Sequence, residues 1–207
     1  MLHQPSCGAR SAMRPARAIV LAALLGTTGA GAAEEAPVIA DADSSVPAPE
    51  AALQGGELLA ALRRGGYVIY FRHTATDFSR NDAGMTGYAD CANQRPLNEQ
   101  GRRDAQAIGA TVRALGLPVA EAFASPFCRT MEHARLMLVD VSPRMEVREA
   151  QSGDYAGLKG LLAAPVVARG NRWIVGHGIP FRAVAGPPHL AEGEAVFRRV
   201  LAGEAIS

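Results

Sequence analysis

The stretch YVIYFRHT at residues 67–74 decides both the fold class and the chemistry that we expect. Five bulky, β-favouring residues occupy 67–71, which is the length and composition of a buried strand. Arg72 and His73 follow at once, so a cation and an imidazole stand at the carboxyl end of that strand. In layered α/β proteins, ligands bind beyond the carboxyl ends of the strands. These two residues are therefore the first candidates for a functional site.

Strand-like and helix-like segments alternate along the rest of the chain. Asn98 is a suitable N-cap for a helix whose apolar residues recur from Ala105 to Leu115, and Gly116 ends it. This alternation predicts one layered α/β domain. Two further helices are expected, one at 57–64 and one that follows the segment 125–129 and ends at Leu138. The expected strands are at 122–124, 145–147, 172–175 and 195–201.

Two further candidate residues also follow predicted strands. Arg129 comes after 122–124, and His177 comes after 172–175. We therefore expect both to meet His73 in one crevice. Guanidinium groups match phosphate oxygens and stay charged, while a neutral imidazole can attack phosphorus near neutral pH. The set predicts phosphoryl transfer with His73 as the nucleophile.

The N-terminus has the pattern of a secretory signal peptide. Residues 1–17 hold arginines and no acidic residue, residues 18–25 are an apolar run, and residues 30–32 are Ala-Gly-Ala. The apolar run is shorter than the about 20 residues of a membrane span. An uncleaved N-terminal anchor is the alternative. We expect a signal peptide at 1–33, a disordered acidic, Pro/Ala-rich linker at 34–50 and a folded domain at 51–207, located in the periplasm or secreted.

Cysteine usage and charge narrow the classes of protein further. Cys7 falls in the expected signal peptide, which leaves Cys91 and Cys128 in the mature chain. An even count in an oxidising compartment predicts a disulfide between them, and two free buried thiols are the alternative. The formal net charge of +1 does not indicate a nucleic-acid or membrane-surface binder, and no stable membrane span is expected in the mature chain.

Four segments resemble the landmarks of the histidine phosphatase superfamily, also called phosphoglycerate mutase-like. They are YFRHTAT at 70–76, RPLNEQG at 95–101, SPFCRTM at 125–131 and VGHG at 175–178. The resemblance implies a three-layer α/β/α sandwich of the α/β class. It implies that His73 is phosphorylated and that Arg72, Arg129 and His177 hold the phosphoryl group. It also implies that neither a metal nor an organic cofactor is required.

The proton donor of such a reaction has several candidates. Glu149 stands where the larger branch of the family has its acid, although Ser152 replaces the aromatic residue expected nearby. Asp154 is the second candidate, and Glu192 or Glu194 is the third. A merely structural carboxylate at Glu149 is the alternative.

The sequence departs from the family pattern beside the nucleophile. Thr74 replaces the usual Gly, which would reshape the pocket mouth, and Ser79 replaces a frequent Asn. We expect Arg95 to anchor its loop, Arg182 to widen the anion site or lie on the surface, and His133 and His189 to be structural.

The predicted function is that of a phosphomonoester hydrolase with a phosphohistidine intermediate. It would act outside the cytoplasm on envelope sugar phosphates or small phosphoesters. The alternatives are a phosphohistidine-protein phosphatase and a catalytically inert phosphate-binding module, for which Thr74 and the open proton donor argue. A mutase is disfavoured because the domain is too short for the insertions of those enzymes. The expected partner is a small phosphorylated substrate, and the oligomeric state is open.

Overall fold

The structure of the protein is a computed structural model, and it describes residues 53–148, 153–166, 169–187 and 189–199. All of them belong to the unit Glu50–Ser207. The expected signal peptide and linker lie outside the described residues. Within these ranges, no helix combines the length and hydrophobicity needed to cross a membrane.

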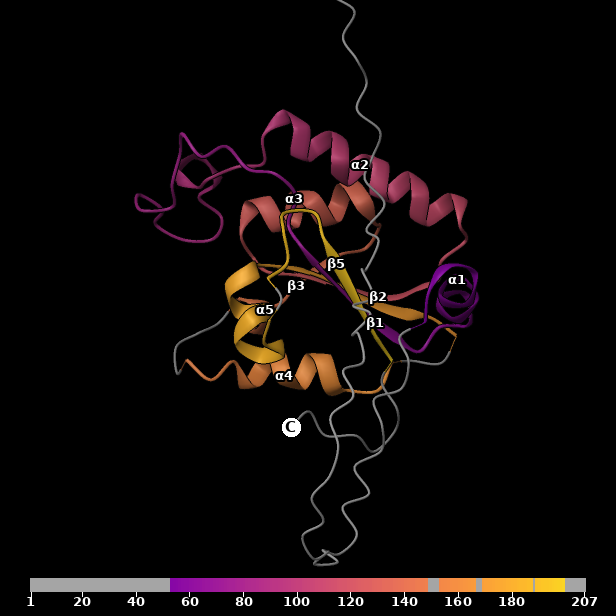
Figure 1. Ribbon diagram of the computed structural model, residues 1–207. Coiled ribbons are helices and arrows are strands. Elements are labelled where there is room, and N and C mark those ends of the chain that lie inside the picture. The colour runs from indigo at the N-terminus through magenta and orange to yellow at the C-terminus, as the bar shows by residue number, and fades with distance from the viewer. Residues whose placement is uncertain (1–52, 149–152, 167–168, 188, 200–207) are drawn as a thin grey trace, which may run out of the picture. The chain divides into compact units, whose positions relative to one another are not determined.

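The described residues form a five-stranded sheet with the strand order β3-β2-β4-β1-β5 (Figure 1). The three neighbouring pairs from β3 to β1 are parallel, and β5 runs antiparallel to β1 at one edge. The carboxyl ends of β1, β2 and β4 therefore share one edge of the sheet. The strands are β1 Tyr67–Arg72, β2 Val119–Ala124, β3 Ser142–Pro143, β4 Asn171–Gly176 and β5 Ala195–Arg199.

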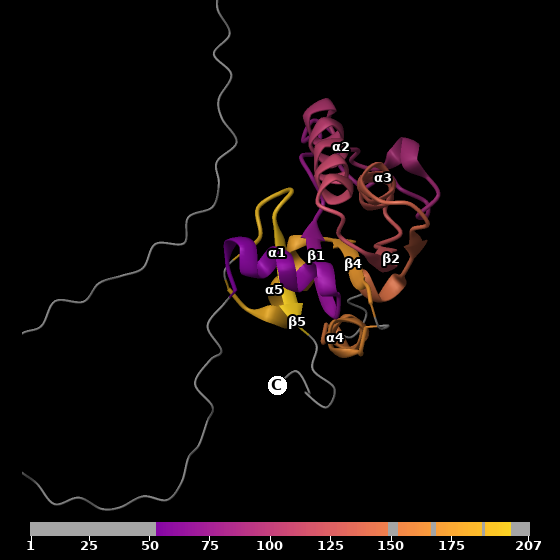
Figure 2. The ribbon, with the colours of Figure 1, turned by 90° about the vertical axis from the view of Figure 1, so that its right-hand side faces the viewer.

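Helices cover both faces of this sheet, which gives the expected three-layer α/β/α sandwich (Figures 1 and 2). One layer holds α1 Gly55–Arg64, α2 Glu99–Ala114 and α3 Cys128–Met137, and the other holds α4 Ala156–Ala163 and α5 Gly178–Ala185. Two short 3-10 helices, η1 Cys91–Asn93 and η2 Met145–Val147, lie in the connections.

Alternate residues of β1 feed the two cores on either side of the sheet. Ile69 and Phe71 pack with the α1–α3 layer, whereas Val68 and Tyr70 pack with the α4–α5 layer. Successive side chains of a strand point to opposite faces. A strand that is covered on both faces must be apolar throughout, which explains the unbroken run that precedes Arg72.

The start of α2 fixes the segment that follows His73. The Asn98 side chain accepts a hydrogen bond from the Gly101 N–H at 2.8 Å, as expected of an N-cap. A Cβ atom at Gly101 would lie 2.1 Å from the Ala75 carbonyl oxygen. Only glycine allows α2 to approach so closely, and the helix thereby buttresses the chain two residues beyond His73.

The strand expected at residues 145–147 is wrong. These residues form η2, and the strand of this region is the two-residue β3 at Ser142–Pro143. The last hydrogen bond between this strand and β2 runs from the Arg144 N–H to the Ala124 carbonyl. The Val147 N–H then donates to the Arg144 carbonyl, which closes a helical turn. Val147 is fully buried while Met145 is exposed, so these two apolar residues do not share one face, as they would in a strand.

Candidate active site

The predicted phosphoryl-binding residues share one pocket of about 460 Å³ at the carboxyl edge of the sheet. Arg72 ends β1 and His73 follows it, Arg129 lies in the first turn of α3, and His177 follows β4. The structure thus brings together residues from three separate strand ends. The same pocket is lined by Arg95, Arg148, Tyr155, His189 and the start of α5.

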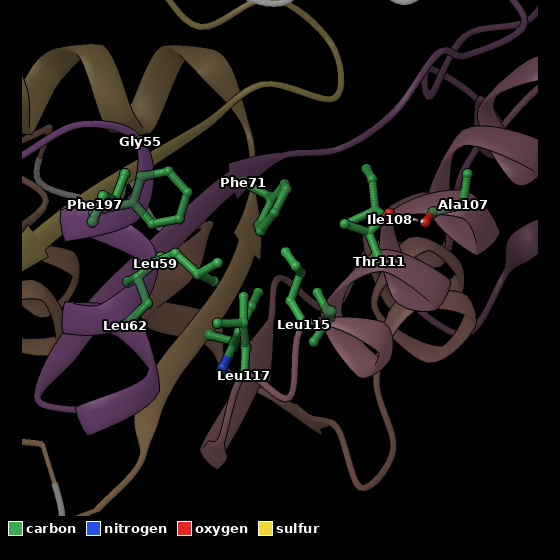
Figure 3. Close-up of a pocket in the computed structure, with 13 residues that line it drawn as sticks. Gly55, Leu59, Leu62, Phe71, Ala107, Ile108, Thr111, Leu115, Leu117 and Phe197 are labelled. Atoms are coloured by element: carbon green, nitrogen blue, oxygen red, sulfur yellow. Dashed lines mark hydrogen bonds between the residues drawn. The ribbon is translucent and has the colours of Figure 1, made fainter.

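A second pocket is unsuited to this chemistry. It measures about 540 Å³ and lies between α1 and α2, with Phe71 and Trp173 among its lining residues (Figure 3). Its described lining contains no ionisable side chain. This pocket therefore offers no cation that could bind an anionic substrate.

His73 is held as a neutral imidazole with one nitrogen free. Its side chain is buried, and Nδ1 lies 2.9 Å from the Thr74 carbonyl oxygen. A carbonyl can only accept, so Nδ1 carries the proton and Nε2 keeps its lone pair. Burial lowers the pKa of His73 to about 4; the hydrogen bond to Thr74 opposes this shift, and the charges of Arg129 and Arg72 add to it.

The segment at residues 190–194 supports Arg72 and His73 from the side of β5. Arg72 Nη1 donates to the Leu190 carbonyl at 2.8 Å, and the Gly193 N–H donates to the His73 carbonyl at 3.0 Å. Gly193 has a φ of +83°, a conformation that glycine adopts without strain. His73 is therefore fixed by main-chain hydrogen bonds on both sides, since its own N–H donates to the Gly176 carbonyl at 3.0 Å.

Glu192 lies on the Nδ1 side of His73. Its Oε1 is 3.9 Å from that nitrogen and 3.7 Å from Arg72 Nη2, and it accepts the Thr76 hydroxyl at 3.0 Å. Glu192 does not line the pocket. It therefore faces the nitrogen opposite to the one that would attack phosphorus, which is the wrong side for a leaving-group acid. Glu194 instead accepts the Ala191 N–H in a local turn.

Arg129 is almost fully enclosed, with 5% of its surface exposed. Its Nη1 donates to Asp82 Oδ1 at 2.9 Å, and its guanidinium lies 4.4 Å from the centre of the Phe127 ring. Its Nε is buried without a hydrogen-bond partner among the described residues. Burial lowers the pKa of Arg129, and the pairing with Asp82 opposes that shift. An anion in the pocket would find a guanidinium already oriented by Asp82.

His177 is held by its main chain and by its ring. The Tyr70 hydroxyl accepts the His177 N–H and donates to the His177 carbonyl, both at 2.9 Å. The ring Nε2 lies 2.9 Å from Ser125 Oγ, so it is Nε2, and not Nδ1, that makes the hydrogen bond with Ser125. Burial, followed by the charge of Arg129, lowers the pKa of His177 well below its usual value. His177 is therefore a neutral partner for a phosphoryl oxygen.

A disulfide ties the loop after His73 to the start of α3. Cys91 and Cys128 are bridged, with Cα atoms 5.6 Å apart, so the pairing expected from the sequence is present. The buried Gln94 reinforces this link, because its Oε1 accepts the Cys128 N–H at 2.9 Å. Arg129 follows Cys128 directly, and both contacts therefore fix its position.

Comparison with protein-family models gives the family. The model of the histidine phosphatase superfamily (branch 1) matches residues 68–166, a range that includes His73 and Arg129. The chain belongs to the histidine phosphatase superfamily. It is accordingly a phosphatase, and a phosphorylated compound is its substrate.

Several solved structures resemble the chain at low sequence identity. SixA from Agrobacterium tumefaciens, a proposed phosphohistidine phosphatase, is 17% identical, with a TM-score of 0.46 over 64% of this chain and 90% of its own. A structure of SixA in complex with tungstate is 16% identical, with a TM-score of 0.46 over 63% of this chain and 86% of its own. The product of the reading frame Rv3214 from Mycobacterium tuberculosis is 18% identical, with a TM-score of 0.48 over 68% of this chain and 94% of its own. A search of curated proteins found no match.

Sequence reasoning missed three residues that lie at the candidate site of this histidine phosphatase. Asp82 pairs with Arg129, and its carboxylate also accepts the Arg95 N–H at 2.8 Å. Ser125 contacts His177, and Arg148 lines the pocket with its guanidinium 5.3 Å from the Phe127 ring centre. Ser125 lies within a landmark segment and could have been found there. Nothing in the sequence pattern marks Asp82, because its loop has no periodicity.

Two arginines that the sequence left open have different positions in the histidine phosphatase domain. Arg95 anchors its loop as expected, through its main chain, and it also lines the pocket with its guanidinium 4.7 Å from the Phe78 ring centre. Arg182 is exposed on α5 and does not line the pocket. The anion site is therefore extended by Arg95, and not by Arg182.

None of the described residues that line the pocket is an Asp or Glu, so the carboxylates at 154, 192 and 194 that were candidates for the proton donor do not line it. Glu149 lies outside the described residues. Asp154 is exposed, and its carboxylate accepts the Ala156 N–H at 3.1 Å. The described residues also contain no group of three or more His, Cys, Asp or Glu side chains suited to a metal ion.

Proposed function

We propose that this histidine phosphatase hydrolyses phosphomonoesters through a phosphohistidine formed at Nε2 of His73. One observation carries the proposal: the Thr74 carbonyl accepts a hydrogen bond from the Nδ1–H of His73, so the unprotonated Nε2 is available beside the pocket's arginines. A nucleophile that is neutral before attack needs no separate base to activate it.

In the first step the Nε2 lone pair attacks phosphorus and the bond from phosphorus to the leaving oxygen breaks. Arg72 and Arg129 neutralise the equatorial oxygens, and His177 contributes a further contact. The leaving oxygen takes a proton from a carboxylic acid, for which Glu149 remains our candidate. The product is a phosphoramidate on His73, whose ring keeps its Nδ1 proton and is cationic.

Glu192 contributes to this step by its charge. It stands 3.9 Å from Nδ1, on the side away from the incoming phosphorus, and it is held there by Thr76. A carboxylate in this place stabilises the cationic ring of the intermediate. The segment that carries Glu192 is itself fixed to His73 by the Gly193 N–H.

In the second step water attacks phosphorus and the bond from phosphorus to Nε2 breaks. The electron pair of that bond returns to the imidazole, and the water gives a proton to the carboxylate left by the first step. Inorganic phosphate leaves, and His73 is restored with its proton on Nδ1.

The site of action in this proposal is the periplasm or the exterior of the cell. Two observations support export: the signal-like residues 1–33 and the Cys91–Cys128 disulfide, a bond that persists in oxidising compartments. Sugar phosphates of the envelope and small phosphoesters are the substrates that such a location offers. Cell fractionation with the mass of the mature chain tests this part, and a full-length chain in the cytoplasm contradicts it.

A phosphohistidine-protein phosphatase is the second candidate. It is favoured by the lack of an Asp or Glu among the described residues that line the pocket, because a phosphoramidate leaving group needs less help from an acid. The catalytically inert reading predicts phosphate binding without turnover.

One assay separates these functions. Hydrolysis of p-nitrophenyl phosphate, an alkyl phosphate and a phosphohistidine peptide is measured from pH 4 to 8, with His73→Ala and the control Arg182→Ala, at an exposed residue that does not line the pocket. The proposal expects turnover of phosphoesters that His73→Ala abolishes and Arg182→Ala retains. Turnover of the peptide alone supports the second candidate, and phosphate binding without any turnover supports the inert reading.

A further inference from the structure

His133 is a buried histidine that the phosphoryl chemistry leaves unused. It lies on α3 with its side chain fully buried, and its Nδ1 accepts the Thr74 N–H at 3.3 Å. The carbonyl of the same Thr74 accepts the His73 Nδ1 proton at 2.9 Å. His133 and His73 are therefore joined through the backbone of one residue.

The protonation of His133 follows from this contact. A nitrogen that accepts the Thr74 N–H carries no proton, so the neutral ring has its proton on Nε2. Burial, followed by the proximity of His73, lowers the pKa of His133 to about 3, and the ring stays neutral at working pH. Only one tautomer of His133 is compatible with the hydrogen bond to Thr74.

Packing alone does not explain an imidazole at this position. Nε2 of His133 is buried and has no hydrogen-bond partner among the described residues. A buried donor without an acceptor destabilises a fold, whereas an apolar side chain of similar size would leave nothing unpaired at that end. The hydrogen bond to Thr74 is the one polar contact that the ring makes within the described part of the chain.

The Thr74 side chain plays no part in this connection. Its Oγ1 is buried without a partner among the described residues, and its Cγ2 lies 3.5 Å from where a Cβ of Gly193 would stand. The main-chain N–H and carbonyl of Thr74 make the two hydrogen bonds that matter. Loss of the hydroxyl should therefore leave both bonds in place.

We propose that His133 is a positioning residue that sets the tautomer of His73. His133 accepts a hydrogen bond from the Thr74 N–H and so holds the Thr74 backbone in place. The Thr74 carbonyl is then aligned to accept a hydrogen bond from the Nδ1–H of His73. Nε2 is then left free for attack. Without an acceptor at 133, the Thr74 N–H turns toward another partner and the carbonyl loses its alignment. This inference rests on the proposed role of His73 as the nucleophile.

Two substitutions separate the acceptor from the volume of the side chain. In His133→Asn, Oδ1 is bonded to Cγ as Nδ1 is, so an acceptor remains near the Thr74 N–H. In His133→Leu the space is filled and the acceptor is lost. Thr74→Ala is the matched control, because it removes the hydroxyl and keeps both main-chain groups. Thermal unfolding of each variant shows whether it is folded.

The first measurement is the tautomer of His73 by ¹⁵N NMR of the two ring nitrogens. We expect the Nδ1–H form in the wild type, Thr74→Ala and His133→Asn, and a loss of this preference in His133→Leu. The second is the rate at which p-nitrophenyl phosphate phosphorylates His73 in a single turnover. We expect His133→Leu to lose about tenfold or more in rate, by analogy with small misplacements of catalytic groups, and His133→Asn to recover most of that loss.

Three results would overturn the inference. One is an Nε2–H tautomer of His73 in the wild type, which needs no variant and holds even if His133→Leu fails to fold. Another is a folded His133→Leu protein with unchanged tautomer and rate. The third is a His133→Asn protein as impaired as His133→Leu. If the wild type puts no phosphate on His73, the proposed function fails instead, while the tautomer spectrum still decides the role of His133.

Discussion

Asp82 Oδ1 lies 2.9 Å from Arg129 Nη1, which joins the loop after the nucleophile to the first turn of α3. The loop position of Asp82 is itself set by the Arg95 N–H, which donates to the same oxygen. The buried guanidinium thus faces the pocket with its orientation already fixed. Catalysis by fixed charges depends on such pre-organisation.

Replacing Asp82 tests this relationship. We expect Asp82→Asn to lower kcat/KM by about tenfold, because Arg129 loses its counter-ion and its fixed orientation. Asp104→Asn is a control of the same chemistry, because Asp104 is only partly buried and does not line the pocket. Steady-state kinetics on p-nitrophenyl phosphate measure the effect, and equal kcat/KM values for the two variants would show that Arg129 does not depend on Asp82.

The acid stability of the protein gives a second test of the same carboxylate. Burial raises the pKa of Asp82, but hydrogen bonds from the Arg95 N–H and from Arg129 outweigh it, and the net pKa is lowered. The stability from this pair is therefore present above the unfolded pKa of about 3.9 and is lost as pH falls through the lower folded value. In chemical unfolding from pH 3 to 6, the free energy of unfolding should fall less toward acid pH for Asp82→Asn than for the wild type. Parallel curves contradict the assignment.

The disulfide is expected to stabilise both the fold and the site. Removal of a native bridge from a small domain costs about 2–5 kcal/mol of unfolding free energy. We expect the Cys91→Ser/Cys128→Ser variant to lose stability in that range and also to lose activity, because Cys128 precedes Arg129. Thiol titration of the unfolded, unreduced mature protein should find no free thiol. Two free thiols would mean that the bridge does not form.

The pH dependence of attack follows from the burial of His73. Because its pKa is lowered to about 4, the neutral nucleophile persists as pH falls well below the usual histidine value of about 6.5. We expect the acid limb of kcat/KM, corrected for the substrate's own titration, to fall near pH 4. A limb near 6.5 would mean that His73 is not desolvated as the structure places it.

The identity of the proton donor can be tested by comparing substrates with poor and good leaving groups. If Glu149 protonates the departing oxygen, Glu149→Gln slows the hydrolysis of an alkyl phosphate by about 10² or more and that of p-nitrophenyl phosphate much less. Asp154→Asn is the matched control. Equal losses on both substrates remove Glu149 from this role, and a selective loss in Asp154→Asn assigns the role to Asp154.

Elements with strong local patterns could be predicted from the sequence. The apolar run of β1 and the N-cap at Asn98 lie where expected, and the strand ends at His73 and His177 form part of one pocket. These features depend on short stretches of chain. They could be found because the residues that follow buried parallel strands necessarily share an edge of the sheet.

Features that depend on tertiary contacts could not be predicted. Met145 and Val147 are both apolar, but only Val147 is buried, and the tertiary packing that makes this difference leaves no mark in the local sequence. The pairing of Asp82 with Arg129 joins residues far apart in sequence, and no local pattern marks it. The link from His133 to Thr74 was hidden for the same reason, since a lone histidine on a helix indicates only a structural residue.

The central claim is that Nε2 of His73 carries the phosphoryl group during turnover. The most direct measurement is mass spectrometry of the wild type and His73→Ala, denatured at neutral or alkaline pH during turnover of p-nitrophenyl phosphate. The account predicts one acid-labile phosphoryl group on the peptide that contains His73, and none in His73→Ala. A wild-type enzyme that turns over without phosphate on that peptide, or a His73→Ala enzyme that remains active, would contradict it.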